Sequence, residues 1–419
     1  MKIIISLAIV YAGFGISFVL NGYLSRHLDL DGYGDIQVAL GIASIGGVLL
    51  ILGGQAASRR FIPRYLSSER YGEIKGFVSH YLRIALFIGA GATVLALLVA
   101  GLFNYLGLEH LTHEALIAVC ITPLIAISLF FGSVIQSMQR TAAAILPHEV
   151  IRPSLFLLGC VVWLYLFGTF NEIQVIGILF VVLCAVIVIQ FYLMVTGLPF
   201  KWFEASAASE REAWHTVSIP LLYSILANSI LIRIDVLALE VMHADEKAVG
   251  VFTLLLFIAS LVWMNFNAIS NVISPKIAGL DGEKAGLQTL FDGTIKTALL
   301  INLAVAGLIV VFADEILGWF HGDLLNYKTW LYVVLIGAVI NCALEVAAPF
   351  VRIGGLQREA ARLASICLIG TIVVTPTAIA FFGMPGAIAS LIGMRFVRGM
   401  GYMYFLYTRI GIAPFRAVR

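Results

Sequence analysis

Charged residues are what this sequence has least of: Asp, Glu, Lys and Arg make up only 12% of its 419 residues, whereas 61% are hydrophobic and the mean hydropathy is +1.01. Soluble domains carry about 25% charged and about 45–50% apolar residues. A soluble fold of this length would still need a polar surface, which this composition does not supply. The sequence therefore predicts a polytopic membrane protein. A net charge of +2 without a basic tail gives no reason to expect a nucleic-acid partner.

Paired cysteines and catalytic motifs are also lacking. The five cysteines all fall inside apolar runs and have no CxxC spacing, so neither a disulfide framework nor a zinc site is predicted. The sequence has no nucleophile–base–acid spacing, no cluster of metal-ligating residues and no phosphate-binding loop. A membrane enzyme that polymerises or ligates glycans would be expected to have a substantial external loop or clustered acids. We therefore expect neither an enzyme nor a bound metal.

Long apolar runs fill most of the chain. Each run is long enough to cross about 30 Å of hydrocarbon, and none has the alternating pattern of a membrane barrel strand. Because backbone groups in lipid must be hydrogen-bonded within their own segment, the sequence predicts an all-α protein with twelve transmembrane helices. The predicted spans are 3–25, 36–57, 77–103, 115–138, 146–169, 173–196, 215–239, 249–273, 291–313, 329–350, 361–382 and 386–408.

The basic residues predict the orientation of these spans, because cytoplasmic loops are enriched in Lys and Arg. One side of the membrane holds nineteen of them, whereas the opposite loops hold only Arg26, Lys247 and Lys328. Both termini are therefore expected in the cytoplasm. The nineteen are Lys2, Arg59, Arg60, Arg64, Arg70, Lys75, Arg140, Arg152, Lys201, Arg211, Lys276, Lys284, Lys296, Arg352, Arg358, Arg362, Arg409, Arg416 and Arg419.

The chain also divides into two similar halves. The most polar connecting segment lies at its midpoint, which predicts a six-helix half at 1–197, a cytoplasmic linker at 198–214 and a second half at 215–419. Six helices per half give repeats of parallel topology around a central cavity. The supporting matches are Gly34 and Ile42-Ala43-Ser44 with Gly250 and Ile258-Ala259-Ser260, Met138–Ala143 with Leu356–Ala361, and Pro63-Arg64 with Pro275-Lys276.

Short motifs lie around the second and fourth predicted spans: Leu28-Asp29-Leu30-Asp31-Gly32-Tyr33-Gly34, Gly53-Gly54, Arg64-Tyr65 and Gln139-Arg140. With these motifs and the two halves in view, the sequence resembles the multidrug/oligosaccharidyl-lipid/polysaccharide (MOP) exporter superfamily, and within it the O-antigen and capsule repeat-unit flippases. The resemblance covers essentially the whole chain. It departs from the lipid II flippases of the superfamily, which have two further helices.

This resemblance implies a flippase that moves a polyprenyl-diphosphate-linked oligosaccharide, an O-antigen, capsule or exopolysaccharide repeat unit, from the cytoplasmic to the outer leaflet by alternating access. It implies the inner membrane of a bacterium as location, and membrane lipids and a polysaccharide polymerase machinery as further partners. No cofactor is expected beyond a coupling ion, H+ or Na+. Two alternatives stay open: an ion-coupled multidrug exporter, and a flippase for another lipid-linked substrate such as lipid II.

Four arginines inside the predicted spans are the candidate binding residues for an anionic headgroup: Arg395, Arg398, Arg83 and Arg233. An arginine near the bilayer centre costs about 2.5–3.5 kcal/mol on insertion scales, so it usually faces protein or a water-filled cavity. Arg395 lies nine residues from the outer end of its span and thirteen from the inner end, where snorkelling is least able to explain it. For Arg83 and Arg233, snorkelling and a lumen-facing role both stay open. Guanidinium groups pair bidentately with phosphate oxygens.

Uncharged polar and acidic residues add a second set of predictions. They recur at helical spacing in the first, seventh and eighth spans, as expected of side chains that line a cavity or pack between helices. Asp235 and Glu345 are the deepest acids and the candidates for ion coupling. The polar residues expected to face the lumen are Ser17, Asn21, Ser25, Asn228, Asp235, Asn267 and Asn271.

Overall fold

The computed structural model describes residues 2–106, 116, 118–242, 247–280 and 283–413. All regular elements in these ranges are helices, which confirms the predicted all-α class. The chain forms two compact units, residues 1–233 (the N-terminal unit) and residues 234–419 (the C-terminal unit). The boundary falls inside one long helix, α11 (Arg211–Met242), rather than in the polar linker. The predicted repeat boundaries stay a prediction.

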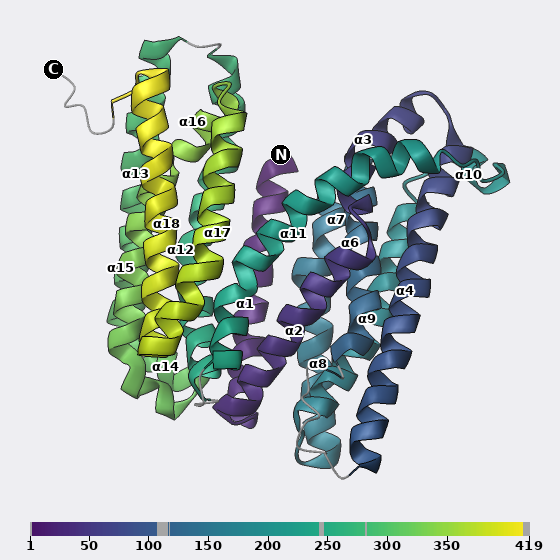
Figure 1. Ribbon diagram of the computed structural model, residues 1–419, viewed down its shortest axis with the longest axis horizontal. Coiled ribbons are helices and arrows are strands. Elements are labelled where there is room, and N and C mark those ends of the chain that lie inside the picture. The colour runs from purple at the N-terminus through teal and green to yellow at the C-terminus, as the bar shows by residue number, and fades with distance from the viewer. Residues whose placement is uncertain (1, 107–115, 117, 243–246, 281–282, 414–419) are drawn as a thin grey trace. The chain divides into compact units, whose positions relative to one another are not determined.

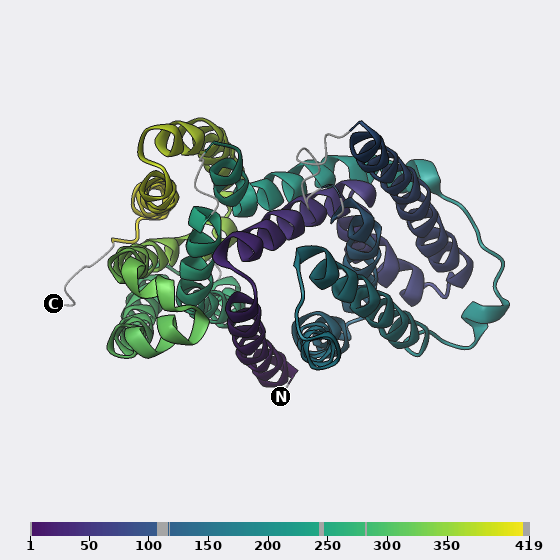
Figure 2. The same cartoon turned by 90° about the horizontal axis from the view of Figure 1, so that it is seen from below.

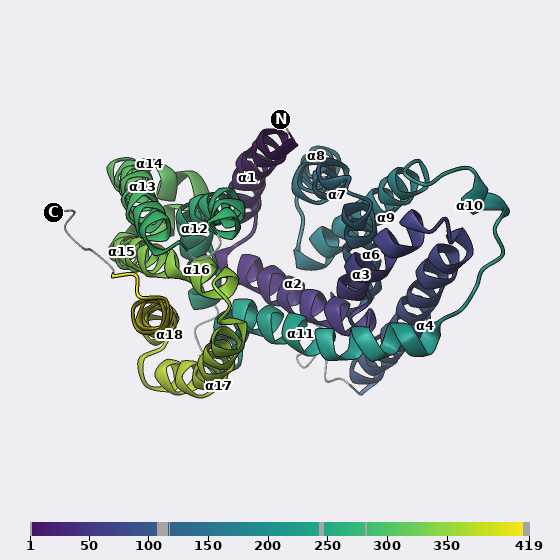
Figure 3. The same cartoon turned by 90° about the horizontal axis from the view of Figure 1, so that it is seen from above.

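The N-terminal unit is built around α6, which contacts α2, α3, α4 and α9 (Figures 1, 2 and 3). Its core is aromatic: Phe77 meets Trp214 edge-on, with ring centroids 5.4 Å apart. The elements of this unit besides α11 are α1 (Lys2–His27), α2 (Leu30–Leu50), α3 (Gly54–Ser67), α4 (Tyr71–Tyr105), η2 (Val119–Ile121), α6 (Thr122–Ser137), α7 (Thr141–Leu146), η3 (Pro147–Ile151), α8 (Arg152–Phe167), α9 (Glu172–Val195) and α10 (Lys201–Glu204).

The second predicted span, 36–57, is wrong at both ends. The helix begins at Leu30 and ends at Leu50, and a turn separates it from α3. The reason is local, because Leu52 and Gly53 adopt positive φ values of 45° and 78°, which an α-helix does not tolerate. An apolar run therefore continues past the point where its helix stops.

The fifth predicted span, 146–169, begins too late. The segments α7, η3 and α8 form one continuous helical run over 141–167 that is long and apolar enough to cross a membrane. The element η3 is a π-helix of five residues, and it leads directly into Arg152. Arg152, which the count of basic residues assigns to the cytoplasmic side, therefore lies deeper in the helical run than predicted, because Pro147 and Pro153 are accommodated within the run instead of marking its start.

The C-terminal unit packs α18 between α15 and α17 (Figure 3). Small residues allow these close approaches: a Cβ on Gly386 would overlap the carbonyl oxygen of Ala378, and one on Gly399 would press on Leu344. The elements are α12 (Lys247–Gly279), α13 (Lys284–Val311), α14 (Ala313–Phe320), η4 (Gly322–Tyr327), α15 (Lys328–Glu345), α16 (Ala347–Ile353), α17 (Gln357–Phe382), α18 (Met384–Phe405) and η5 (Leu406–Ile410).

Ten of the described helical segments have the length and composition of membrane spans, so this is a multi-pass membrane protein. The two predicted spans outside that set are α11 and α18. Both helices carry charged residues: α11 contains Arg233 and Asp235, and α18 contains Arg395 and Arg398. The total of twelve spans and the cytoplasmic placement of both termini stay predictions.

The linker between the predicted halves is docked on the N-terminal unit. Glu210 accepts hydrogen bonds from the hydroxyl of Tyr65 at 2.5 Å and from Arg70 at 2.5 Å, and the indole of Trp214 donates to the same hydroxyl at 2.8 Å. The hydrogen bonds from Tyr65 and Arg70 lower the pKa of Glu210. Burial, with the bond to Glu210 second, raises the pKa of Tyr65 to about 12. The linker is therefore held by a charged network.

This network predicts a pH dependence of stability. A folded-state pKa below the ordinary value of 4.5 means that Glu210 stabilises the fold above that pH. The stabilisation is lost as the pH falls through the depressed pKa. Glu210→Gln is expected to lower the thermal midpoint by a few degrees at most at neutral pH, since exposed ion pairs contribute little. The difference from wild type should shrink towards acidic pH in thermal scans of the purified protein. A difference that grows on acidification would contradict this assignment.

Candidate functional site

Two of the predicted arginines lie side by side in α18 but have different partners. Arg398 donates from Nε to Oε1 of Glu345 at 2.9 Å, and its terminal nitrogen pairs with the same oxygen. The guanidinium of Arg395 lies 4.2 Å from the ring centroid of Trp263 in α12. Such cation–π contacts are strongest where the cation is desolvated. The face of α18 that carries these arginines therefore lies against other helices of the C-terminal unit.

The two acids predicted for ion coupling belong to the same cluster. Asp235 is 3% exposed and accepts a hydrogen bond from the hydroxyl of Thr375 at 3.3 Å. Arg395 interacts electrostatically with both Asp235 and Glu345. Two guanidinium groups thus face two carboxyl groups, which is a balance of charge when both acids are ionised. We refer to Asp235, Glu345, Arg395 and Arg398 as the C-terminal cluster.

A second charged cluster lies in the N-terminal unit. Arg233 in α11 interacts electrostatically with Tyr33 and with Arg152, at the start of α8. The only carboxylate among the described residues that acts on Arg152 is Glu149 in η3. No carboxylate of the described chain lies within 4.0 Å of either guanidinium. We refer to Arg152, Arg233 and Glu149 as the N-terminal cluster.

The predicted polar stripe of the first span borders the N-terminal cluster. A Cβ on Gly13 would overlap the backbone carbonyl of Glu149, so α1 and η3 are in close contact there. Further along α1, Asn21 donates to the carbonyl of Ser17 at 2.7 Å and accepts from the hydroxyl of Tyr33 at 2.6 Å. Ser25 is fully buried. Helix packing accounts for Gly13, whereas a role of Ser17, Asn21 and Ser25 in a lumen stays a prediction.

The remaining predicted residues join neither cluster. Arg83 is exposed on α4, and Asn228 is exposed on α11. The side chains of Asn267 and Asn271 lie outside the described residues. One turn before Arg83, His80 instead contacts His215, with the two Nε2 atoms 3.0 Å apart.

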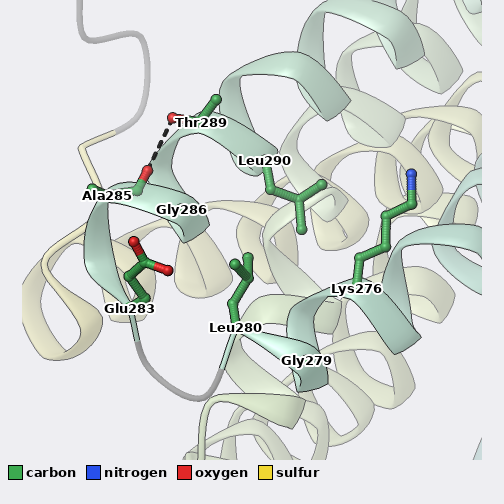
Figure 4. Close-up of a pocket in the computed structure, with 8 residues that line it drawn as sticks. All are labelled: Lys276, Gly279, Leu280, Glu283, Ala285, Gly286, Thr289 and Leu290. Carbon is green, nitrogen blue, oxygen red and sulfur yellow. Dashed lines mark hydrogen bonds between the residues drawn. The ribbon is translucent and has the colours of Figure 1, made fainter.

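A hollow of about 770 Å³ lies apart from all predicted residues, between the end of α12 and the start of α13 (Figure 4). Its wall is formed mostly by small and apolar residues, and Lys276 and Glu283 are its charged members. Thr289 in this wall donates to the carbonyl of Ala285 at 3.0 Å, so its hydroxyl is already engaged. The hollow has no concentration of charge that would select an anion.

Comparison with models of protein families shows to which family this chain belongs. The family model described as polysaccharide biosynthesis protein matches residues 1–280. The chain belongs to this family. A search of curated proteins gave no match. The match spans the N-terminal cluster and the whole of α11 and α12, including Asp235 and Trp263 of the C-terminal unit.

Solved structures show which fold this family member has. It is similar to an inward-facing multidrug resistance MATE transporter of the MOP superfamily, with TM-score 0.73, 16% identity and 98% of each chain covered. It is also similar to the lipid II flippase MurJ, with TM-score 0.72, 12% identity, and 97% and 88% covered. A MOP transporter from Pyrococcus furiosus matches at TM-score 0.63, 16% identity, and 98% and 95% covered. These likenesses establish the MOP-transporter fold.

Sequence reasoning missed three residues in and around these clusters of this polysaccharide biosynthesis protein: Arg152, Glu149 and Trp263. Arg152 was counted on the cytoplasmic side and Glu149 was not singled out, although the apolar run before Pro147 could have shown that the helix starts earlier. Trp263 carried no signal at all, because an aromatic residue in an apolar run is usually a packing residue. Only the approach of α12 to α18 shows that it meets Arg395.

Proposed function

We propose that this protein is a flippase that moves a polyprenyl-diphosphate-linked oligosaccharide from the cytoplasmic to the outer leaflet of a bacterial inner membrane by alternating access. The observation that carries the proposal is that a member of the polysaccharide biosynthesis family has arginines inside predicted membrane spans of both compact units. Such arginines are expensive in lipid and mark substrate pathways. Their planar forks match the oxygens of a diphosphate. The lipid tail would stay in the bilayer.

The test is translocation in reconstituted vesicles. A lipid-linked oligosaccharide is incorporated on one side, and its appearance on the other side is followed with a lectin that cannot cross the membrane. Wild-type protein should accelerate this appearance over protein-free vesicles. Drug-stimulated proton or sodium flux without glycan translocation would instead favour the multidrug exporter. Translocation of lipid II alone would favour a flippase for that lipid-linked substrate.

Arg395→Ala is expected to reduce translocation by at least about tenfold, because a charge-assisted contact to phosphate contributes about 1.5–3 kcal/mol. The matched control is Lys296→Gln, which removes an exposed cation from α13 of the same unit. Equal translocation by Arg395→Ala and wild type, at equal reconstitution, would remove Arg395 from the mechanism.

Ion coupling is proposed to act through Asp235. It is the better candidate of the two acids, because Glu345 is already paired with Arg398. A buried carboxyl in a membrane helix is a typical carrier of H+ or ligand of Na+. Asp235→Asn should leave residual translocation that no longer responds when ionophores collapse the H+ or Na+ gradient. An unchanged response to the gradient would exclude Asp235 as the coupling residue.

A further inference from the structure

The two arginines of α18 differ in what their side chains contact. Arg398 is paired with Glu345, so its donors are engaged within the protein. The guanidinium of Arg395 lies 4.2 Å from the ring centroid of Trp263. Among the described residues it has no hydrogen bond and no carboxylate within 4.0 Å. The cation of Arg395 is therefore held by an aromatic ring, and no described group takes up its N–H donors.

A ring contact leaves the hydrogen-bonding capacity of a guanidinium intact. The face of Trp263 attracts the positive charge through the ring quadrupole, and tryptophan does so more strongly than tyrosine or phenylalanine. The N–H donors of a guanidinium lie in its plane and point outward from it. A guanidinium over a ring can therefore donate to a further group, whereas one paired with a carboxylate has fewer donors left. Of the two arginines, Arg395 has its donors available to a ligand.

The helices that carry the ring and the guanidinium are both anchored on α15. The thiol of Cys342 donates to the backbone carbonyl of Val262, the residue before the tryptophan, at 3.8 Å. The amide of Asn341 donates to the carbonyl of Ile392, about one turn before the arginine, at 3.2 Å. Asn341 and Cys342 are adjacent, and both are buried. α15 therefore fixes the separation of α12 and α18 at the level where the two side chains meet.

The contact is also accessible to a ligand. Trp263 and Arg395 are both half-buried, so a group can approach the edge of the guanidinium without displacing the ring. An arginine in a membrane helix is costly to insert, and a cation–π contact offsets only part of that cost. Phosphate oxygens would accept the donors that the ring leaves available.

We propose that Trp263 is a positioning residue of the headgroup site: its ring fixes the guanidinium of Arg395 so that the N–H donors are presented to phosphate oxygens of the substrate. The inference rests on the proposed function, because it takes the substrate to carry a diphosphate. Arg398 has a structural role in this arrangement, since Glu345 engages its donors. Removal of the ring keeps the charge but releases the side chain into other rotamers, which weakens binding.

The experiment measures binding of farnesyl diphosphate to the purified protein in lipid nanodiscs by calorimetry. Wild type should bind it more tightly than inorganic pyrophosphate and should not bind farnesol measurably. Trp263→Leu should weaken binding about fivefold, and Trp263→Phe, which keeps a ring face, about twofold. The matched control is Trp330→Leu, which removes a half-buried tryptophan from α15 of the same unit and should leave binding unchanged.

A double-mutant cycle distinguishes positioning from packing. Arg395→Gln alone should weaken binding about tenfold or more, because it removes a charge-assisted contact. If the ring acts through the guanidinium, Trp263→Leu should have no further effect in the Arg395→Gln background. A tryptophan that only supports the fold would weaken binding by the same factor in both backgrounds.

Fluorinated tryptophan keeps the test valid if Trp263→Leu does not fold. Replacing all six tryptophans of the chain by 5-fluorotryptophan nearly preserves their shape. It withdraws charge from the ring faces and so weakens their attraction for a cation. Binding should weaken on this replacement in wild type and stay the same in Trp263→Phe, where position 263 has no tryptophan to fluorinate.

Failure of this inference differs from failure of the proposed function. If Arg395→Gln weakens farnesyl diphosphate binding but neither Trp263→Leu nor fluorination does, the inference is overturned and the proposed function is retained. An equal effect of Trp263→Leu in both backgrounds overturns it as well, since Trp263 then acts independently of Arg395. If wild type does not bind farnesyl diphosphate, both the inference and the proposed substrate class fail.

Discussion

Replacing Glu345 by alanine is expected to destabilise the protein by about 3 kcal/mol. The side chain of Glu345 is 8% exposed and is paired with Arg398, whose side chain is 28% exposed. Breaking a buried ion pair by removing one partner costs about 3–5 kcal/mol, and the partial exposure of Arg398 favours the lower end of that range. Unfolding of the purified protein in mixed micelles, followed by tryptophan fluorescence, measures the loss.

The control for this prediction removes both charges. Glu345→Leu combined with Arg398→Leu should be close to wild type in stability, because an apolar pair of similar volume leaves no uncompensated charge in the membrane. Together with the single variants it forms a double-mutant cycle that isolates the pair energy. If Glu345→Ala were as stable as wild type, the pair would contribute nothing measurable and the cluster would not be organised around it.

Replacing Gly53 by alanine is expected to destabilise the N-terminal unit by about 3 kcal/mol or more. Gly53 has φ of 78°, which costs a residue with a Cβ about 1–2 kcal/mol. The added Cβ would also overlap the carbonyl oxygen of Ser218 in α11, and overpacking costs about 1–3 kcal/mol. The same unfolding assay measures the combined effect.

Two other glycines separate the backbone term from the clash. Gly168 has φ of 81° with no atom within 4 Å of a Cβ, so Gly168→Ala should show the conformational cost alone. Gly15 lies in α1 with equally open space, so Gly15→Ala should be neutral or slightly stabilising. Equal losses at Gly53 and Gly168 would show that α3 and α11 separate easily at this point.

The C-terminal cluster has two arginines and two acids, and its net charge changes when Asp235 gains or loses an ion. Substitution of Asp235 should therefore affect the dependence of translocation on the ion gradient.

Much of the helical fold followed from the sequence, because lipid leaves a long apolar run little alternative to a helix. The predicted ends of the second and fifth spans were wrong because backbone angles and prolines, rather than hydrophobicity, determine where those helices end. The turn at Leu52 and Gly53 interrupts an apolar run through its backbone angles, and the helix that contains Arg152 passes through two prolines. Hydropathy averages over a window and does not register either feature.

For the candidate site, the sequence predicts the unusual residues but not their contacts. That Arg395, Arg398 and Arg233 are unusual could be predicted from one chain, since the cost of a charge in lipid depends on the residue and its depth. Their partners could not be predicted. Arg398 and Glu345 are 53 residues apart, and Asp235 and Thr375 are 140 apart. Pairing depends on how each helix is rotated against its neighbours, which local sequence does not fix.

The sequence alone therefore determined that this is a multi-pass helical membrane protein with arginines inside its predicted spans. Composition and the length of apolar runs are local properties, and they suffice for that conclusion. Only the tertiary structure decided which charges are compensated. Close approaches at small residues such as Gly13 and Gly399 set the helix contacts, and those contacts leave Arg398 paired and Arg152 without a carboxylate within 4.0 Å among the described residues.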